Sequence, residues 1–547
     1  MARPQPATMS HSAHLDSFAR DHLPPADTWP EIDLSHPNYA YPERLNAAVE
    51  LLDRWVEKGH GAARCLIGGG ETWSYRDLQA RVNRIANVLT RELGLVPGNR
   101  VLLRSANTPM MAACYLAVLK AGGIAVGTMP LLRAGELKAI LRKAEISHAL
   151  CDAALKEELE AARASCPGLT VLRTWNAEGA ESLDALMARQ PADFDAVDTA
   201  AEDISLIAFT SGTTGEPKGC LHNHRDLLAI CDGFSREVLR PEASDLFCGS
   251  PPLAFTFGLG GLLLFPLRVG AASLLLEKAS PPELVKAIEV HKATICVTAP
   301  TAYRAMLAAL GGHDVSSLRK GVSAGEALPK ATSDAFFDAT GLRLIDGIGA
   351  TELLHIFISA REEEIRPGAT GKVVPGYSAR VLDEDGRPLP PGRVGRLAVK
   401  GPTGCRYLAD ARQRKYVRDG WNLTGDAYLV DEEVYFWFQA RADDMIVSSG
   451  YNIAGPEVEN AVLTHPAVAE CAVVGTPDPE RGALVTAFVV LKPEVKASPA
   501  LAEAIQDHVK ASIAPYKYPR EIEWRDALPK TQTGKLQRFR LREAGAS

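Results

Sequence analysis

Apolar runs alternate with amphipathic stretches along the first two thirds of the chain. Residues 41 to about 95 have a helical pattern, interrupted by a strand signal at CLIGGGETWSY. Beyond them, short apolar runs such as RVLLRSAN end in Gly, Pro or Asn, and a helix-length segment follows each run. A second block of this kind covers about 203–349, with the apolar runs DISLIAF and ATICVTAP. This alternation predicts strand–helix units around largely parallel sheets.

The pattern changes in the last third of the chain. From 371 to about 435, short alternating strands with turn signals predict a small antiparallel β unit. After it the order strand, helix, two strands, helix, strand is enough for an α+β domain of about a hundred residues. The fold class expected is therefore α/β, with mixed and parallel sheets flanked by helices, a small β subdomain and a C-terminal α+β domain. The expected boundaries are an N-terminal domain over 1–440, a hinge at 441–444 and a C-terminal domain over 445–547.

Composition and charge narrow the class of protein. The chain has 547 residues, of which 46% are apolar, and 60 Lys and Arg against 67 Asp and Glu give a net charge of −7. A disordered or collagen-like chain is excluded by these values. No long block of like charge is present, so we expect neither nucleic acid nor an anionic membrane as a partner.

The cysteines and the apolar segments indicate a cytoplasmic protein. The ten cysteines are dispersed and form no C-x-x-C pair, which favours reduced thiols over a disulfide framework or a zinc site. The first residues include no apolar stretch typical of a signal peptide. The most apolar segment, 254–267, contains Gly and Pro and falls short of the ~20 residues of a spanning helix. A monomer and a homodimer are both compatible with this composition.

The loop FTSGTTGEPKG (209–219) follows the apolar run DISLIAF. Its glycines let main-chain N–H groups turn inward, and its hydroxyls and Lys218 could help to cradle a polyphosphate. A polar surface hairpin is the alternative interpretation. The chain has no Walker loop, because Gly534 and Lys535 are followed by Leu536. The candidate phosphate-binding residues are Thr210, Ser211, Gly212, Thr213, Thr214, Gly215 and Lys218.

This loop closely resembles the phosphate loop of the superfamily of AMP-forming acyl- and aryl-CoA synthetases, nonribosomal adenylation domains and luciferases. Further motifs follow in the order of that family. IGATE (348–352) resembles Y-G-x-T-E with Ile in place of Tyr, and GWNLTGD (420–426) matches G-W-x-x-T-G-D. RADDMI (441–446) resembles the hinge motif, although Ala440 replaces the usual Gly, and PKTQTGKLQR (529–538) matches P-K-x-x-x-G-K-[IL]-x-R. The resemblance covers essentially the whole chain.

The resemblance implies roles for single residues of the ATP site. Glu352 would bind Mg²⁺ and Thr351 the α-phosphate, which suits a hard oxygen ligand and a hydroxyl, although Thr-Glu at a helix start is more often a cap. Asp426 would bind two ribose hydroxyls. Lys535 would stabilise charge on the α-phosphate during adenylation. Catalytic roles are thus expected for Lys535, Thr351, Glu352 and Lys218. The turn that contains Gly325, Glu326 and Ala327 resembles the adenine-side turn of the family. The other expected ATP or AMP contacts are Gly325, Glu326, Ala327, Ile348, Gly349 and Arg441.

The resemblance also implies how coenzyme A binds. In the family the C-terminal domain rotates about the residue that matches Asp443, so that one pocket serves adenylation and then thioester formation. Ser449, Gly450 and Tyr451 would line the pantetheine tunnel. Lys517 and Arg520 are candidates for the nucleotide phosphates of CoA, with scattered surface cations as the alternative. His222 and His224, just after the phosphate loop, are equally compatible with helix capping or packing and with an active-site role.

The acyl pocket of this superfamily is built by segments that match PLAFTFGLG (252–260) and TELLHIF (351–357). Amino-acid adenylation domains place an Asp in the first segment, and here there is none. GIGATELLHIF and FGLGG resemble the benzoate-CoA ligase branch, and two N-terminal segments resemble 2-aminobenzoate-CoA ligases. Benzoate-CoA ligases commonly have Ala and Tyr at the positions of Thr256 and Phe257, so a substituted ring is expected. The residues expected around the ring are Thr256, Phe257, Gly349, His355 and Ile356.

The sequence thus predicts an ATP- and Mg²⁺-dependent aryl-CoA ligase with coenzyme A as co-substrate. The expected acid is 2-aminobenzoate, with benzoate or a hydroxybenzoate as the next candidates. One alternative is a stand-alone aryl acid adenylation enzyme that loads a carrier protein. Another is a non-catalytic protein that binds adenylate or CoA, but such a protein should lack Lys535 or Asp443, and both are present.

Overall fold

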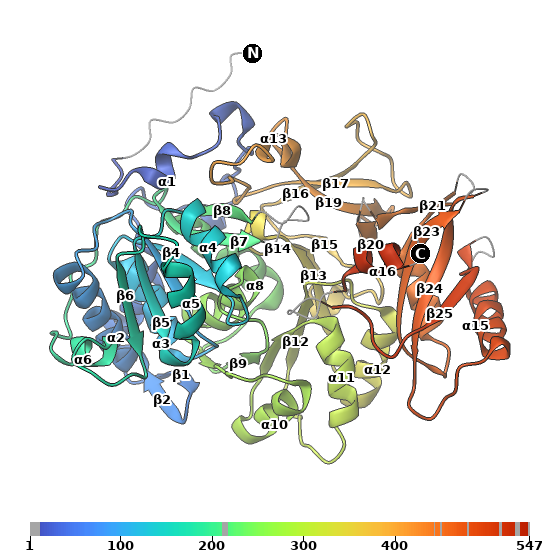
Figure 1. Ribbon diagram of the computed structural model, residues 1–547, viewed down its shortest axis with the longest axis horizontal. Helices are drawn as coiled ribbons and strands as arrows, with labels where there is room; N and C mark the ends of the chain where they lie inside the picture. Colours follow the sequence, from blue (N-terminus) through green and yellow to red (C-terminus); the bar gives the residue numbers. More distant parts are fainter. Residues whose placement is uncertain are drawn as a thin grey trace.

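Two large sheets and a smaller C-terminal domain make up the fold, as Figure 1 shows from left to right. The structure is a computed structural model. Its described residues are 11–210, 217–441, 444–448, 451–478, 481–513, 517–530 and 536–544.

The first sheet has six strands in the order β6-β5-β3-β4-β7-β8. All neighbours are parallel except β7 and β8, which form an antiparallel pair. The apolar runs of the sequence form the buried central strands, as expected for a parallel sheet with both faces covered. The strands are β3 (Arg100–Arg104), β4 (Ile124–Thr128), β5 (His148–Asp152), β6 (Val171–Trp175), β7 (Ile204–Thr210) and β8 (Lys218–Asn223).

The second sheet has nine strands in the order β15-β14-β13-β12-β11-β9-β10-β1-β2. Its centre is parallel, and antiparallel strands close both edges. The strands are β1 (Arg64–Gly68), β2 (Glu71–Ser74), β9 (Leu246–Gly249), β10 (Ala272–Leu274), β11 (Ile295–Thr298), β12 (Lys320–Ala324), β13 (Leu344–Gly349), β14 (Ile356–Ser359) and β15 (Lys372–Val373).

An antiparallel unit follows, and then the C-terminal domain. The unit contains β16 (Ser378–Leu382), β17 (Gly395–Lys400), β18 (Val417–Arg418), β19 (Trp421–Val430) and β20 (Phe436–Arg441). The C-terminal domain contains the hairpin β21 (Ile446–Ser448) and β22 (Tyr451–Ile453), and a sheet of β23 (Val468–Asp478), β24 (Gly482–Leu491) and β25 (Glu521–Trp524). The expected α/β class is confirmed.

Helices connect the parallel strands and cover the sheets. Those of the first sheet are α3 (Pro109–Lys120), α4 (Ala134–Lys143), α5 (Lys156–Arg163) and α6 (Leu183–Ala188), and those of the second are α2 (Tyr75–Asn87), α10 (Pro281–His291), α11 (Pro300–Ala309) and α12 (Lys330–Thr340). The others are α1 (Phe18–Asp21), α7 (His224–Ile230), α8 (Thr256–Leu259), α9 (Phe265–Val269), α13 (Gln413–Tyr416), α14 (Gly455–Leu463), α15 (Pro499–Ser512) and α16 (Arg538–Ala544). Among the described residues, no helix is long and apolar enough to cross a membrane.

Helix α3 illustrates how the sequence sets these elements. The Thr108 hydroxyl accepts a hydrogen bond from the N–H of Met111, and Pro109 occupies the first helical position, a combination that favours a helix start. All but one of the twelve residues of α3 are buried, since the helix packs between the two sheets of the domain. A helix that is apolar on every side is stable only in such a fully covered position.

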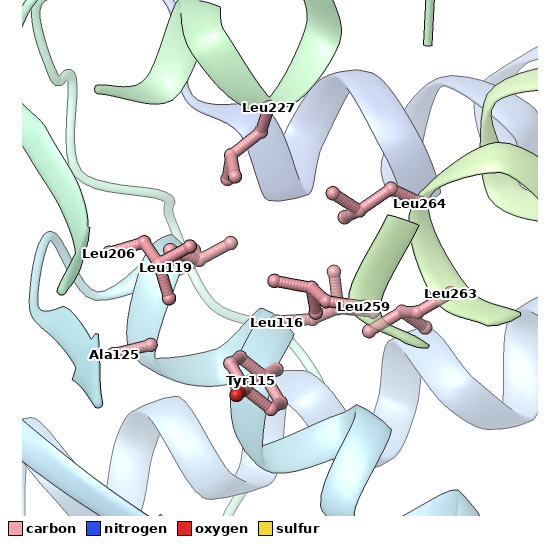
Figure 2. A pocket seen from close by; sticks show the side chains of 9 residues that line it. All are labelled: Tyr115, Leu116, Leu119, Ala125, Leu206, Leu227, Leu259, Leu263 and Leu264. Carbon is pink, nitrogen blue, oxygen red and sulfur yellow. The ribbon is translucent and has the colours of Figure 1, made fainter. Parts of the chain in front are cut away.

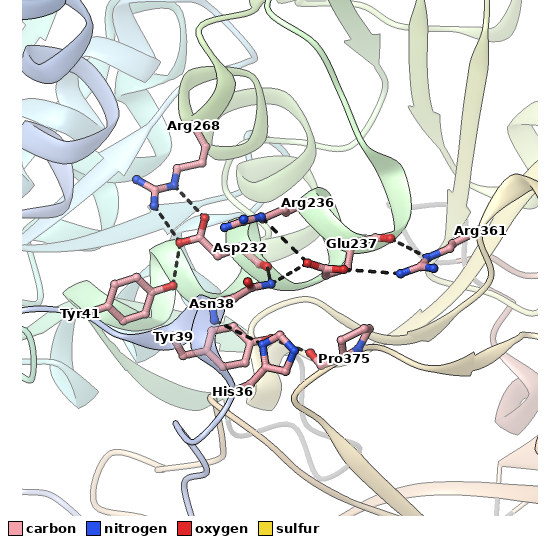
Figure 3. Close-up of polar contacts among 10 residues, drawn as sticks. All are labelled: His36, Asn38, Tyr39, Tyr41, Asp232, Arg236, Glu237, Arg268, Arg361 and Pro375. Carbon is pink, nitrogen blue, oxygen red and sulfur yellow. Dashed lines mark hydrogen bonds and ion pairs between the residues drawn. The ribbon is translucent and has the colours of Figure 1, made fainter.

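The N-terminal segment 11–40 lies across several parts of the domain. The hydroxyl of Tyr39 donates to the carbonyl of Pro375 (2.8 Å), and Tyr41 donates to Asp232 (2.8 Å), as Figure 3 shows. Asp232 also holds the guanidinium of Arg268 with both carboxylate oxygens, at 3.0 and 2.8 Å. The segment therefore ties the helical residues Cys231–Leu239 to the connection that precedes β16.

A small cavity lies in the core between α3 and the residues that follow α8 (Figure 2). Leucine side chains dominate its lining, and its one polar group is the hydroxyl of Tyr115, which has no hydrogen-bond partner among the described residues. A Cβ atom on Gly127 would lie only 1.9 Å from this hydroxyl oxygen and 3.0 Å from the Cα of Ala254. Glycine at 127 therefore lets strand β4 approach α3 closely.

Candidate functional site

The phosphate loop connects the antiparallel strands β7 and β8. Thr210 at the end of β7 pairs in register with Lys218 at the start of β8, so both ends of the loop are fixed by the sheet. The candidate residues Ser211, Gly212, Thr213, Thr214 and Gly215 lie outside the described residues. Their phosphate-binding role stays a prediction.

Thr351 and Glu352 stand on a short helical turn, Thr351–Leu353, that follows β13. His222 of β8 is fully buried, and its Nε2 lies 2.8 Å from the carbonyl oxygen of Thr351. A carbonyl only accepts, so Nε2 carries the proton and donates. This bond places the Thr351 turn beside the strand that follows the phosphate loop.

Tyr407 connects two of the expected catalytic residues. Its hydroxyl donates to a carboxylate oxygen of Glu352, and the Nζ of Lys218 lies 3.5 Å from the same hydroxyl oxygen. The ring is fully buried, and burial together with the charge of Glu352 holds the pKa of Tyr407 well above its usual range. Sequence reasoning missed Tyr407, because one tyrosine in a loop belongs to none of the motifs.

The residues around Glu352 fit a magnesium ion. Mg²⁺ is commonly held by one or two carboxylates together with phosphate oxygens of the substrate, rather than by an all-protein cage. The described part of the chain has no group of three or more His, Cys, Asp or Glu side chains arranged around a metal position. Glu352 offers hard oxygen atoms and Thr351 a hydroxyl, which are suitable donors for a phosphate-bound Mg²⁺.

Asp426 and Arg441 face each other across the antiparallel pair β19 and β20. They are partners in register, and Nη1 of Arg441 donates to Oδ1 of Asp426 at 2.8 Å. Burial raises the pKa of Asp426, and the Arg441 charge opposes this only in part. The charge of Glu352 acts on the pKa of both side chains, raising each of them. The expected hinge residue Asp443 lies outside the described residues.

The expected adenine side is built at the carboxyl ends of the neighbouring parallel strands β12 and β13. Gly325 follows β12 with φ +92°, a conformation that glycine adopts without strain. Glu326 and Ala327 continue this turn, and the charge of Glu326 acts on Arg538 of the C-terminal domain. Ile348 and Gly349 end β13, next to the Thr351 turn.

Asp346 in the same strand was not singled out from the sequence. It is in register with Ser323 of β12, and its Oδ1 has no hydrogen-bond partner among the described residues. Burial raises the pKa of Asp346 to about 8. A carboxyl group with this pKa is largely protonated at neutral pH and can then donate a hydrogen bond at the adenine side.

Aromatic rings surround His355 in the expected acid pocket. The ring centroid of His355 lies 5.8 Å from that of Phe257 and 4.6 Å from that of Phe265. Neither ring nitrogen completes a hydrogen bond with a described group, and burial lowers the pKa of His355 to about 3 although the main chain of Phe257 opposes this. Ile356 starts β14, and the main chain of His355 lies close against Gly349.

Thr256 begins helix α8 in the same region and is 9% exposed. Its hydroxyl has no hydrogen-bond partner in the described part of the chain. The ring of the next residue, Phe257, contacts the ring of His355, so Thr256 lies one residue from this aromatic cluster.

The expected CoA residues lie on the C-terminal domain. Ser449 and Gly450 fall outside the described residues, and Tyr451 begins the strand β22. Lys517 pairs with both carboxylate oxygens of Glu457, at 2.6 and 2.7 Å, and Arg520 lies over the ring of Tyr518. Their contact with CoA phosphates remains a prediction. Lys535 likewise lies outside the described residues.

The two histidines after the phosphate loop have different environments. His222 contacts the Thr351 turn, as described above. His224 is fully buried at the start of α7, and its Nδ1 accepts a hydrogen bond from the N–H of Ala47 at 3.2 Å. Burial lowers the pKa of His224 to about 3. The packing interpretation therefore describes His224, whereas His222 contacts the Thr351 turn and its active-site role stays a prediction.

Comparisons with known proteins agree with this geometry. The AMP-binding enzyme model matches residues 52–407, and the model of the C-terminal domain of AMP-binding enzymes matches residues 457–535. Benzoate–CoA ligase of Thauera aromatica is 36% identical over 514 residues, which cover 93% of this chain and 98% of that protein.

Two solved structures share the fold. The crystal structure of the anthranilate CoA ligase AuaEII in complex with anthranoyl-AMP is 36% identical, with a TM-score of 0.89, and the match covers 93% of this chain and 99% of that one. A benzoate CoA ligase from Burkholderia xenovorans LB400 is 32% identical, with a TM-score of 0.84 and coverage of 91% and 100%. From its sequence motifs, its site and these matches, the chain belongs to the AMP-binding enzyme family, among the AMP-forming acid–CoA ligases of the benzoate-CoA ligase branch.

Proposed function

We propose that this protein is an ATP-dependent aryl-CoA ligase whose preferred acid is 2-aminobenzoate. The observation that carries the choice of acid is that the hydroxyl of Thr256 has no hydrogen-bond partner among the described residues, while the neighbouring Phe257 contacts the neutral imidazole of His355. The relative with anthranoyl-AMP bound has a 2-aminobenzoate derivative in the same fold, which supports this choice.

A substituent that forms hydrogen bonds suits this pocket. Neutral imidazole has one acceptor nitrogen and one N–H donor, and a threonine hydroxyl can both donate and accept. An ortho amine can donate to either acceptor, whereas the C–H of benzoate leaves them unpaired. A site whose polar groups pair with a substrate discriminates against analogues that lack the pairing group.

The reaction proceeds in two half-reactions. A carboxylate oxygen of the acid attacks the α-phosphorus of ATP and pyrophosphate leaves. The thiol sulfur of CoA then attacks the carbonyl carbon of the aryl-AMP, AMP leaves, and the thiol proton passes to solvent. When bound, Mg²⁺ neutralises phosphate charge during the first step.

The chain's own residues have separate tasks in this scheme. Glu352 and Thr351 hold the metal and the α-phosphate, Asp426 holds the ribose, and Lys535 stabilises charge at the α-phosphate. The phosphate loop orients the pyrophosphate that departs. Rotation about Asp443 then exchanges the face of the C-terminal domain that covers the pocket.

The test is CoA-dependent AMP release measured over a panel of benzoates. We expect kcat/KM to be higher for 2-aminobenzoate than for benzoate. Thr256→Ala should narrow this difference by about 1 to 3 kcal/mol, the free energy of one such polar group.

The panel also separates the competing interpretations. A wild-type enzyme that prefers benzoate, or an unchanged ratio in Thr256→Ala, would contradict the role of Thr256. AMP release that needs a carrier protein instead of CoA would favour the adenylation enzyme that loads a carrier. Absence of acid-dependent AMP formation with all benzoates would reject the aryl substrate class.

A further inference from the structure

The hydroxyl of Tyr407 lies between two charged groups that do not contact each other. Glu352 accepts its hydrogen bond, and Lys218 lies 3.5 Å from the same oxygen atom and over the tyrosine ring, 5.2 Å from the ring centroid. The ammonium of Lys218 donates to the phenol oxygen of Tyr407, and the phenol in turn donates to the carboxylate of Glu352. Each group makes the hydrogen bond that its chemistry allows.

The backbone fixes Tyr407 with respect to the phosphate loop. Tyr407 forms a β-bridge with Cys220 of β8, and the flanking bonds Leu221 N–H to Arg406 O and Leu408 N–H to Gly219 O are both 2.8 Å long. The N–H of Tyr407 also donates to the side chain of Gln413 (2.9 Å). Cys220 follows Lys218 by two residues in β8, so this bridge fixes the position of Tyr407 relative to Lys218.

From this arrangement we propose that Tyr407 is a positioning residue, whose hydroxyl orients the carboxylate of Glu352 toward Mg²⁺ and keeps it apart from Lys218. The inference rests on the proposed Mg²⁺-binding role of Glu352. One carboxylate oxygen is engaged by a neutral donor, and the other oxygen remains available to the metal. Without the hydroxyl, the carboxylate can rotate and pair directly with Lys218, which neutralises the two charges that the phosphates and the metal require.

A second tyrosine beside Tyr407 provides a matched control for Tyr407→Phe. Tyr416 contacts Tyr407 edge to face, with ring centroids 5.8 Å apart, and its hydroxyl is also buried. Unlike that of Tyr407, this hydroxyl has no hydrogen-bond partner among the described residues. Tyr416→Phe therefore removes the same atom from the same neighbourhood without changing the contacts of Glu352.

The experiment measures Mg²⁺ binding to the full-length enzyme in the presence of ATP and without acid, by isothermal titration calorimetry. We expect Tyr407→Phe to require on the order of 10- to 100-fold more Mg²⁺ for half saturation, since a hydrogen bond to a charged group is lost. Tyr416→Phe should match the wild type. In steady-state assays, Tyr407→Phe should raise the Mg²⁺ concentration for half-maximal rate and leave the KM of the aromatic acid unchanged.

A double-mutant cycle tests whether Tyr407 acts through Glu352. In a Glu352→Gln background, Tyr407→Phe should cause no further loss of Mg²⁺ affinity. Thermal unfolding of each variant shows whether the fold is kept. Unchanged Mg²⁺ affinity in Tyr407→Phe, an equal loss in Tyr416→Phe, or additive losses in the cycle would each overturn the inference. Because the titration contains no acid, its result does not depend on which acid the enzyme prefers.

Discussion

At the scale of single residues, the most informative groups are polar side chains that are buried without full pairing. His224 and His355 are both buried, and in each case burial lowers the pKa to about 3. The pKa of His14, His148 and His465 is also lowered, with burial as the largest cause. These histidines are neutral in the folded protein at neutral pH, so the folded state binds fewer protons than the unfolded state below pH 6.5.

This difference predicts how stability depends on pH. The histidine contribution to the free energy of unfolding should be fully retained above about pH 6.5, the pKa of unfolded histidine, and should fall as the pH decreases toward 3. By pH 5, His224 and His355 should each account for a loss of about 2 kcal/mol. Urea unfolding at pH 7, 6 and 5 measures the effect.

A histidine variant provides the control. His224→Gln removes one titrating group, so its unfolding free energy should change less between pH 7 and pH 5. Carboxylates with a lowered pKa, such as Asp245 and Asp410, act only below about pH 4, outside this window. Asp346, whose pKa burial raises to about 8, and Asp426, whose pKa is also raised, act in the opposite direction, because the folded state holds their protons more tightly than the unfolded state. Their contribution is the same in both proteins and cancels when the wild type is compared with His224→Gln. An equal change of the unfolding free energy between pH 7 and pH 5 in the wild type and in His224→Gln would show that His224 does not remain neutral.

At the scale of elements, the strands could be predicted because each one has a local sequence signal, a short run of apolar residues. Runs such as DISLIAF and ATICVTAP are buried on both sides, and they form β7 and β11 where the pattern places them. The contacts between elements have no such local signal. The bond from His222 to Thr351 joins residues 129 positions apart, and that from Tyr407 to Glu352 joins residues 55 positions apart. Motifs could identify Glu352, but only the fold shows which side chains surround it.

The close approach of β4 and α3 predicts a severe effect of Gly127→Ala. The added Cβ would meet the hydroxyl oxygen of Tyr115 at 1.9 Å and the backbone of Ala254, which lies in the segment of the acid pocket. Overpacking of this kind costs about 1 to 3 kcal/mol of stability. We also expect a higher KM for the acid, measured together with the urea midpoint.

Tyr115→Phe tests whether the loss of stability in Gly127→Ala comes from the clash with the Tyr115 hydroxyl. Its hydroxyl is buried without a partner, so its removal alone should be neutral or stabilising. In the Gly127→Ala background it removes the nearest atom and should recover part of the lost stability. If Gly127→Ala were as stable as the wild type, β4 and α3 would have to be further apart than the structure shows.

At the scale of the whole molecule, an ion pair between described residues joins the C-terminal domain to the rest. Arg304 of α11 lies 4.0 Å from Glu470 of β23, and Glu470 also pairs with Lys530 at 2.6 Å. All three side chains are about one-third exposed, and exposed ion pairs contribute little, with a median of about 0 to 1 kcal/mol. This ion pair therefore opposes a change in the position of the domain only weakly.

Asp443→Pro should restrict this movement. Proline fixes φ, and a hinge residue must change its backbone angles. We expect formation of aryl-AMP to be retained and formation of the thioester to be impaired, as measured by pyrophosphate release and by thioester formation from supplied aryl-AMP. Normal turnover of Asp443→Pro would place the hinge at another residue.

Lys535→Ala should affect the other half-reaction, the formation of aryl-AMP. Loss of one preorganised charge at the α-phosphate typically slows a reaction by ~10² to 10³. Adenylation should decrease by this amount, while supplied aryl-AMP should still react with CoA. Equal losses in both half-reactions would contradict the assigned role of Lys535.

The N-terminal segment has a consequence for biosynthesis. Besides Tyr39, which binds Pro375, the segment contributes the carbonyl of Thr28, which accepts from Gln413, a residue 385 positions later. At synthesis rates of about 5 to 20 residues per second, roughly 20 to 80 s separate the emergence of these two partners from the ribosome. During this time these two contacts cannot form, so the docking of the segment onto the last part of the N-terminal domain is a late event in folding on the ribosome.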